Sequence, residues 1–89
     1  MVKSVPLATT AFGRAVGSLK IFIESGKGPW SRVAAHAEEA VGRSYRGAVS
    51  LEEIFVHQQT AERIVRHTIV NEGTILHETF RATAKFGLK

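Results

Sequence analysis

The longest stretch of the chain without a strong break determines most of what the sequence predicts about its fold. From Leu51 to about Phe86 there is no proline, and Gly73 is the only glycine. Ser50-Leu-Glu-Glu53 has the form of a capping box, in which a serine oxygen and a glutamate satisfy N–H groups at a helix N-terminus. We therefore expect a long helix over about 51–86, roughly 50 Å long at about 1.5 Å per residue. Whether Gly73 kinks or ends it stays open.

This expected helix carries an apolar stripe with polar interruptions. The apolar residues of the stripe recur at helical spacing within an arc of about 100°: Leu51, Ile54, Phe55, Ala61, Val65, Ile69, Leu76 and Phe80. Glu62 falls inside the arc and Glu72 near its edge, and a carboxylate that faces a core is costly unless it is paired. Glu62 either pairs with Arg66 one turn on or joins a polar layer with an arginine of another helix or chain.

A shorter helix is expected at the start of the chain, over about 5–24. Pro6 suits a first helical turn, and the apolar residues that follow recur at steps of three and four. Gly13 and Gly17 each weaken the helix by about 1 kcal/mol, so it needs a packing partner. A strand at LKIFI, residues 19–23, is the alternative, because apolar side chains alternate there.

A turn and a second short helix are expected next. ESGKGPW contains two glycines and a proline, which predicts a turn at 25–29. An alanine-rich stripe that begins at Trp30 predicts a helix over about 30–43, and RSYRGAVS reads as a connector over 44–50.

The fold class that these segments predict is all-α. Two short helices form a hairpin against one long C-terminal helix, in a single helical domain over residues 1–89. The long helix is longer than either short helix, so part of its apolar stripe stays uncovered.

Histidines recur at steps of ten, at His57, His67 and His77. On one helix each step rises about 15 Å and turns partway round, so no single metal ion reaches all three at bond lengths of about 2 Å. The chain has no cysteine, and no serine lies in a nucleophile-elbow context. We expect no metal, no cofactor and no enzymatic activity. A small ribonuclease-type toxin using His and Arg is the enzymatic alternative, and it requires strands that this pattern does not predict.

Charge and hydropathy bear on location. The first acidic residue is Glu24, and before it come Lys3, Arg14 and Lys20 with several hydroxyl residues. This pattern is typical of a retained organellar import segment, or of a plain helix whose acids lie further on. No run approaches the ~20 apolar residues that span a bilayer, so we expect no transmembrane segment. The expected location is intracellular, and the N-terminus favours the mitochondrion.

Two functions remain open. The uncovered stripe predicts a small structural or accessory subunit that docks through amphipathic helices onto a larger assembly or onto copies of itself. Its expected interface residues are Ile69, Leu76, Phe80, Glu62 and Glu72. The alternative, consistent with a net charge of +4, is a basic nucleic-acid-binding protein using cations around the second expected helix. Those cations are Lys27, Arg32, Arg43 and Arg46.

Overall fold

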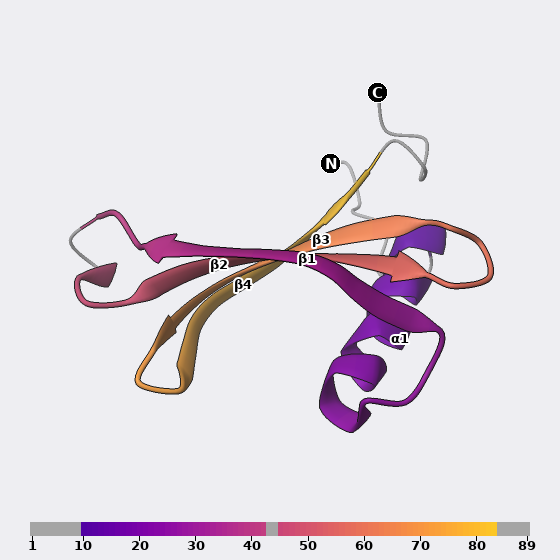
Figure 1. The fold of residues 1–89 in the computed structure, drawn as a ribbon, viewed down its shortest axis with the longest axis horizontal. Coiled ribbons are helices and arrows are strands. Elements are labelled where there is room, and N and C mark those ends of the chain that lie inside the picture. The colour runs from indigo at the N-terminus through magenta and orange to yellow at the C-terminus, as the bar shows by residue number, and fades with distance from the viewer. Residues whose placement is uncertain (1–9, 43–44, 84–89) are drawn as a thin grey trace, which may run out of the picture.

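The chain forms one helix followed by one four-stranded antiparallel sheet. The structure, a computed structural model, describes residues 10–42 and 45–83. The elements in order are α1 (Ala11–Ser25), β1 (Trp30–Glu39), β2 (Val49–His57), β3 (Arg63–Asn71) and β4 (Thr74–Ala82). Each strand pairs with the next, so the sheet order is β1-β2-β3-β4, and α1 packs on one face near one end (Figure 1).

The all-α fold predicted from the sequence is therefore wrong. Only the first expected helix has a counterpart, α1, which begins at Ala11, while residues 5–9 lie outside the described residues. The second expected helix, over 30–43, is the strand β1 as far as Glu39. As far as Thr83, the long helix expected over 51–86 is instead most of β2, all of β3 and β4, and the turns between them, and residues 84–86 lie outside the described residues.

Two turns divide the segment that looked unbroken. Ala61 between β2 and β3 has φ 63°, and Glu72 and Gly73 between β3 and β4 have φ 51° and 80°. In the β3–β4 turn, both central residues of a two-residue loop have positive φ. This is the geometry of a tight hairpin whose twist matches that of its strands. The flanking runs, such as IVRHTIV, are rich in β-branched residues, which fit a pleated surface better than a helix. Both turns form without proline, so the lack of proline between Leu51 and Phe86 is as compatible with hairpins as with a helix.

Backbone pairing, rather than apolar burial, places β1 in the sheet. Trp30 is its only buried residue, and all positions from Arg32 to Glu39 are exposed. The strand nevertheless pairs with β2 along its whole length, with one irregularity between Arg32 and Ala34. The alanines of this segment favour a helix weakly, and tertiary pairing overrides that preference.

Capping groups define both ends of α1. The Thr10 hydroxyl oxygen accepts a hydrogen bond from the Gly13 N–H at 2.8 Å. Gly26 ends the helix in the left-handed conformation, with φ 71°, and its N–H donates to the Phe22 carbonyl oxygen at 2.7 Å. Among residues 10–42 and 45–83, no helix has the length and hydrophobicity that a membrane crossing requires.

The hydrophobic core lies between α1 and one end of the sheet. Its buried residues come from the helix and the first three strands: Val16, Leu19, Trp30, Phe55 and Ile64. The indole N–H of Trp30 donates to the Ser18 hydroxyl at 3.1 Å, so this large side chain is buried with its polar atom satisfied. The β1–β2 connection and the β3–β4 hairpin lie at the opposite end of the sheet, away from α1 (Figure 1).

Truncating Ile64 tests this core. Ile64 is fully buried, whereas Ile21 on α1 is 65% exposed. We expect Ile64→Ala to lower the free energy of unfolding by about 2 to 5 kcal/mol, and Ile21→Ala by under about 0.5 kcal/mol. Urea denaturation followed by circular dichroism measures both variants, and equal losses would contradict the packing described.

Candidate functional site

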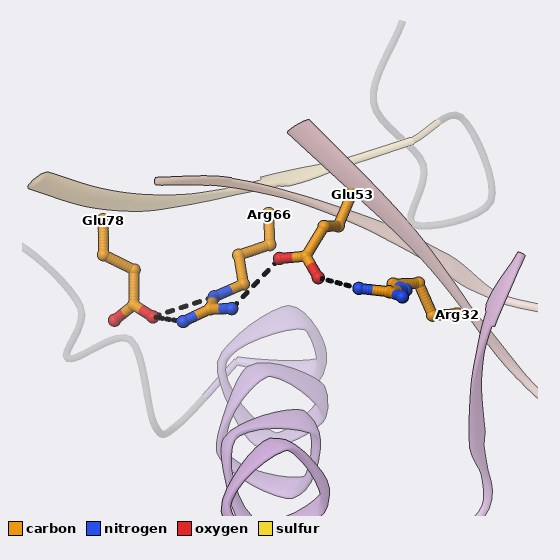
Figure 2. Close-up of polar contacts among 4 residues, drawn as sticks. All are labelled: Arg32, Glu53, Arg66 and Glu78. Carbon is orange, nitrogen blue, oxygen red and sulfur yellow. Dashed lines mark hydrogen bonds and ion pairs between the residues drawn. The ribbon is translucent and has the colours of Figure 1, made fainter. Parts of the chain in front are cut away.

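A chain of four charged side chains, one from each strand, crosses the helix-facing side of the sheet (Figure 2). Glu53 on β2 is only 4% exposed. One of its carboxylate oxygens, Oε2, accepts from Arg32 Nη1 at 3.0 Å, and the other, Oε1, accepts from Arg66 Nη1 at 3.0 Å. Arg66 also donates to Glu78 Oε2, through Nε at 3.0 Å and Nη2 at 2.9 Å. Positive and negative groups therefore alternate from β1 to β4.

Strand register explains how these groups meet. Glu53 lies directly opposite Arg66 in the β2–β3 ladder, and the other two residues reach them diagonally. A buried carboxylate is tolerated when both of its oxygens accept charge-assisted hydrogen bonds. The same pairing overturns the predicted capping box: Ser50 and Glu53 both lie within β2 and cap no helix.

Two hollows flank this ion-pair chain on the helix side of the sheet. The larger has a volume of about 340 Å³ and is lined by Phe22, Ile23, Gly26, Arg32, Glu53, Phe55 and Arg66. The second has a volume of about 320 Å³ and is lined by Lys20, Ile23, Glu24, Arg66, Ile75 and Glu78. Because Ile23 and Arg66 line both, the two hollows adjoin along the C-terminal half of α1.

An aliphatic row crosses the sheet from Ile75 at the second hollow toward the end of β1. Val49, Val70 and Ile75 lie opposite one another on β2, β3 and β4, and Glu39 continues the row on β1. Val49 and Ile75 are both exposed. Exposed aliphatic side chains in adjacent positions form a small patch of the kind that a contact covers.

The opposite face of the sheet carries a polar cluster around His67. Its Nε2 lies 2.7 Å from the Ser50 hydroxyl, and its ring centroid is 5.9 Å from that of His77 on the neighbouring strand. A helix would have separated these two histidines by about 15 Å, so the predicted spacing was wrong. His57 lies apart, with its ring 5.0 Å from Trp30. The described ranges hold no group of three or more side chains suited to a metal ion.

The strands that a ribonuclease-type toxin requires, which the sequence pattern did not predict, are present. Within the described part of the chain, the second ring nitrogen of His67 makes no hydrogen bond that would orient the imidazole for acid–base work. Arg81 is held by Glu52 at 3.4 Å, and this carboxylate would repel a phosphate placed there.

The structure does not bring the five expected interface residues together. Ile69 is buried, and Phe80 packs against the core. Leu76 is exposed at an irregularity in the β3–β4 pairing. Glu62 precedes β3 and accepts from the Thr60 hydroxyl, and Glu72 lies in the β3–β4 turn.

The expected nucleic-acid contacts are also scattered. Lys27 precedes β1, Arg46 follows it, and the ten residues of the strand separate the two by about 33 Å. Arg32 is tied to Glu53, and Arg43 lies outside the described residues.

Sequence reasoning missed the pairing of Glu53 with Arg66, although a signal was present. Glu53 and Phe55 alternate before the QQTA segment, residues 58–61, and Ile64 and Arg66 alternate after it. A hairpin centred on that segment places Glu53 opposite Arg66 and Phe55 opposite Ile64, as the ladder does.

Comparison of the chain with protein families, with curated proteins and with solved structures finds no match.

Removing Arg66 tests the ion-pair chain. Its side chain is 12% exposed, whereas that of Arg81, in the cross-sheet pair with Glu52, is 68% exposed. We expect Arg66→Met to lower the free energy of unfolding by about 3 to 5 kcal/mol, because it leaves the buried Glu53 with one partner. Arg81→Met should change it by under about 1 kcal/mol. Both values come from chemical denaturation, and similar losses would show that burial of Glu53 does not depend on Arg66.

Proposed function

We propose that the chain is a small non-catalytic structural subunit that associates with a second copy of itself through the outer edge of β1. The self-association expected from the sequence is retained, but a sheet edge replaces the amphipathic helices as the contact. The observation that carries the proposal is the position of β1: it is the first strand of the sheet, and its outer edge has no strand beside it among the described residues. Unpaired N–H and C=O groups along such an edge are a template for another strand.

Exposure around β1 supports a contact there. Every residue from Arg32 to Glu39 is exposed, and the interior of that run is mostly small: VAAHA, residues 33–37. Val33 on the strand, Val41 just after it and Val49 opposite its end are exposed aliphatic side chains. Small side chains allow a second strand to approach closely, and the valines would lose water-exposed apolar surface in the contact.

The charge distribution along β1 selects a second copy in antiparallel orientation. Arg32 lies near the start of the strand, and Glu38 and Glu39 are its last two residues. Antiparallel pairing centred on Ala35 brings Arg32 of each copy beside the acidic end of the other. Cross-strand pairs of opposite charge contribute about 0.2–1 kcal/mol each, whereas like charges destabilise.

Head-to-tail association would place β1 of one copy beside β4 of another. It leaves an unpaired β1 edge and an unpaired β4 edge in the assembly, so it continues into a ring or a filament, whereas the pairing of β1 with itself closes into a two-fold dimer.

Cysteine cross-linking tests the pairing and its register. The chain contains no cysteine, so Ala35→Cys introduces a single thiol. We expect this variant to form a disulfide-linked dimer under mild oxidation, because Cα atoms at the centre of an antiparallel pair lie about 4.5–5.5 Å apart, within disulfide range. The control is Thr79→Cys, an exposed position on β4 that should stay largely uncrosslinked. Efficient dimerisation of Thr79→Cys but not Ala35→Cys would contradict the proposal.

Charge reversal tests the orientation. Light scattering coupled to size-exclusion chromatography should give a dimer for the native chain. Glu38→Lys/Glu39→Lys should weaken it about tenfold or more, because each reversal acts twice in a symmetric dimer. Glu24→Lys/Glu72→Lys makes the same change in net charge away from β1 and should leave the dimer intact. A native chain that stays monomeric at about 100 µM, or that grows into filaments, would refute the closed β1 dimer.

A further inference from the structure

We propose that the larger hollow beside α1 binds a small organic anion with an apolar body, through Arg32. Its volume of about 340 Å³ falls in the range of small-molecule sites, about 300–1,000 Å³. Apolar walls come from Phe22, Ile23 and Phe55, and the two phenylalanine rings meet edge to face with centroids 6.3 Å apart. This lining matches the usual composition of a ligand site, apolar walls with a few placed charges.

Arg32 is the charged group in this hollow with unused hydrogen-bonding capacity. Its side chain is 55% exposed, and within the described residues only Nη1 is engaged, by Glu53. By contrast, all three side-chain nitrogens of Arg66 are engaged by Glu53 and Glu78, and both oxygens of Glu53 accept hydrogen bonds. A guanidinium carries five N–H donors, so Arg32 can hold a further acceptor.

The ion-pair chain also prepares Arg32 for an anion. The hydrogen bond to the buried Glu53 fixes one edge of the guanidinium, as Figure 2 shows, so less rotamer freedom is lost when a ligand binds. A planar fork of N–H groups matches a carboxylate in a bidentate geometry. The head group that fits is therefore a carboxylate or a similar oxyanion.

The volume limits the body of the ligand. At about 30 Å³ per water-sized group, the hollow holds on the order of eleven non-hydrogen atoms. Medium-chain fatty acids and bicyclic aromatic acids both have this size and share the same chemistry, an apolar body that ends in a carboxylate. Decanoate represents the medium-chain fatty acids, and 2-naphthoate represents the bicyclic aromatic acids.

Calorimetric titration of the native chain compares each acid with its neutral counterpart, decan-1-ol or 2-naphthol. We expect at least one acid to bind at least tenfold more tightly than its alcohol. Binding of decanoate alone would identify aliphatic acids as the ligand class, and binding of 2-naphthoate alone would identify aromatic acids. If neither acid bound at 1 mM ligand, or if the alcohols bound as well as the acids, the proposal would be overturned.

Variants locate the site. Arg32→Gln should weaken acid binding about tenfold or more, and Arg32→Lys should give an intermediate loss because it keeps the charge and loses the fork. Arg46→Gln removes a charge from an exposed arginine outside the hollow and should leave binding unchanged. Thermal melting checks that each variant folds. If Arg32→Gln does not fold, the comparison of acid with alcohol and the titration of Arg32→Lys still test whether the anion binds through Arg32. Unchanged binding in a folded Arg32→Gln or in Arg32→Lys would refute the role of Arg32.

This site lies within one chain, although the proposed dimer places Arg32 of each copy beside Glu38 and Glu39 of the other. Glu38 and Glu39 do not line the hollow, so Glu38→Lys/Glu39→Lys, which weakens the dimer, should bind the acid at least as tightly as the native chain. A variant that lost both the dimer and acid binding would show that the hollow is completed by the second copy, which would overturn a site within one chain.

Discussion

A carboxylate buried in the middle of a sheet is the constraint on which the rest of this structure depends. Glu53 is removed from water, and its burial is tolerated only because arginines from both neighbouring strands donate to its two oxygens. That requirement couples β1, β2 and β3 in register, and Glu78 extends the coupling to β4. A shift of one residue in any of these strands would turn its charged group to the other face. The ion-pair chain thus specifies the alignment of strands that the small core alone would hold weakly.

The ion-pair chain also divides the helix side of the sheet into regions with different chemistry. On one side, α1 covers the core built around Leu19, Trp30 and Ile64. Along its C-terminal half the helix and the charged groups enclose the two hollows. From Ile75, which lines the second hollow, the aliphatic row continues across the sheet to Val70 and Val49. A single helix of fifteen residues does not cover the whole of a sheet whose strands are nine and ten residues long. Both the ligand site and the β1 contact proposed here arise where the helix leaves the sheet uncovered.

Particular residues show how much of the fold and site the sequence could predict. The helical periodicity of α1 was readable because its apolar side chains meet a single partner surface. The periodicity assigned to 51–86 was a coincidence of strand residues, and the turns that interrupt it use Ala61 and Glu72, residue types that seldom adopt positive φ. Glu62, expected inside an apolar stripe, precedes β3, whereas Glu53, expected as a cap, is the buried charge. A helical pattern and a strand pattern place different residues of the same segment toward the core. Because a helical period was assigned to residues 51–86, the candidate site residues in that segment were predicted at positions that the structure does not show.

By itself the sequence determined a chain without thiol chemistry, a helix in the first third, a break around Gly26 and Pro29, and a marginal core in need of support. Only the tertiary structure decided that residues 30–39, 49–57, 63–71 and 74–82 are strands and that Glu53 meets Arg32 and Arg66. The physical reason is that strand pairing and ion pairing join residues far apart in sequence, such as Arg32 and Glu53. Local propensity carries no information about such partners.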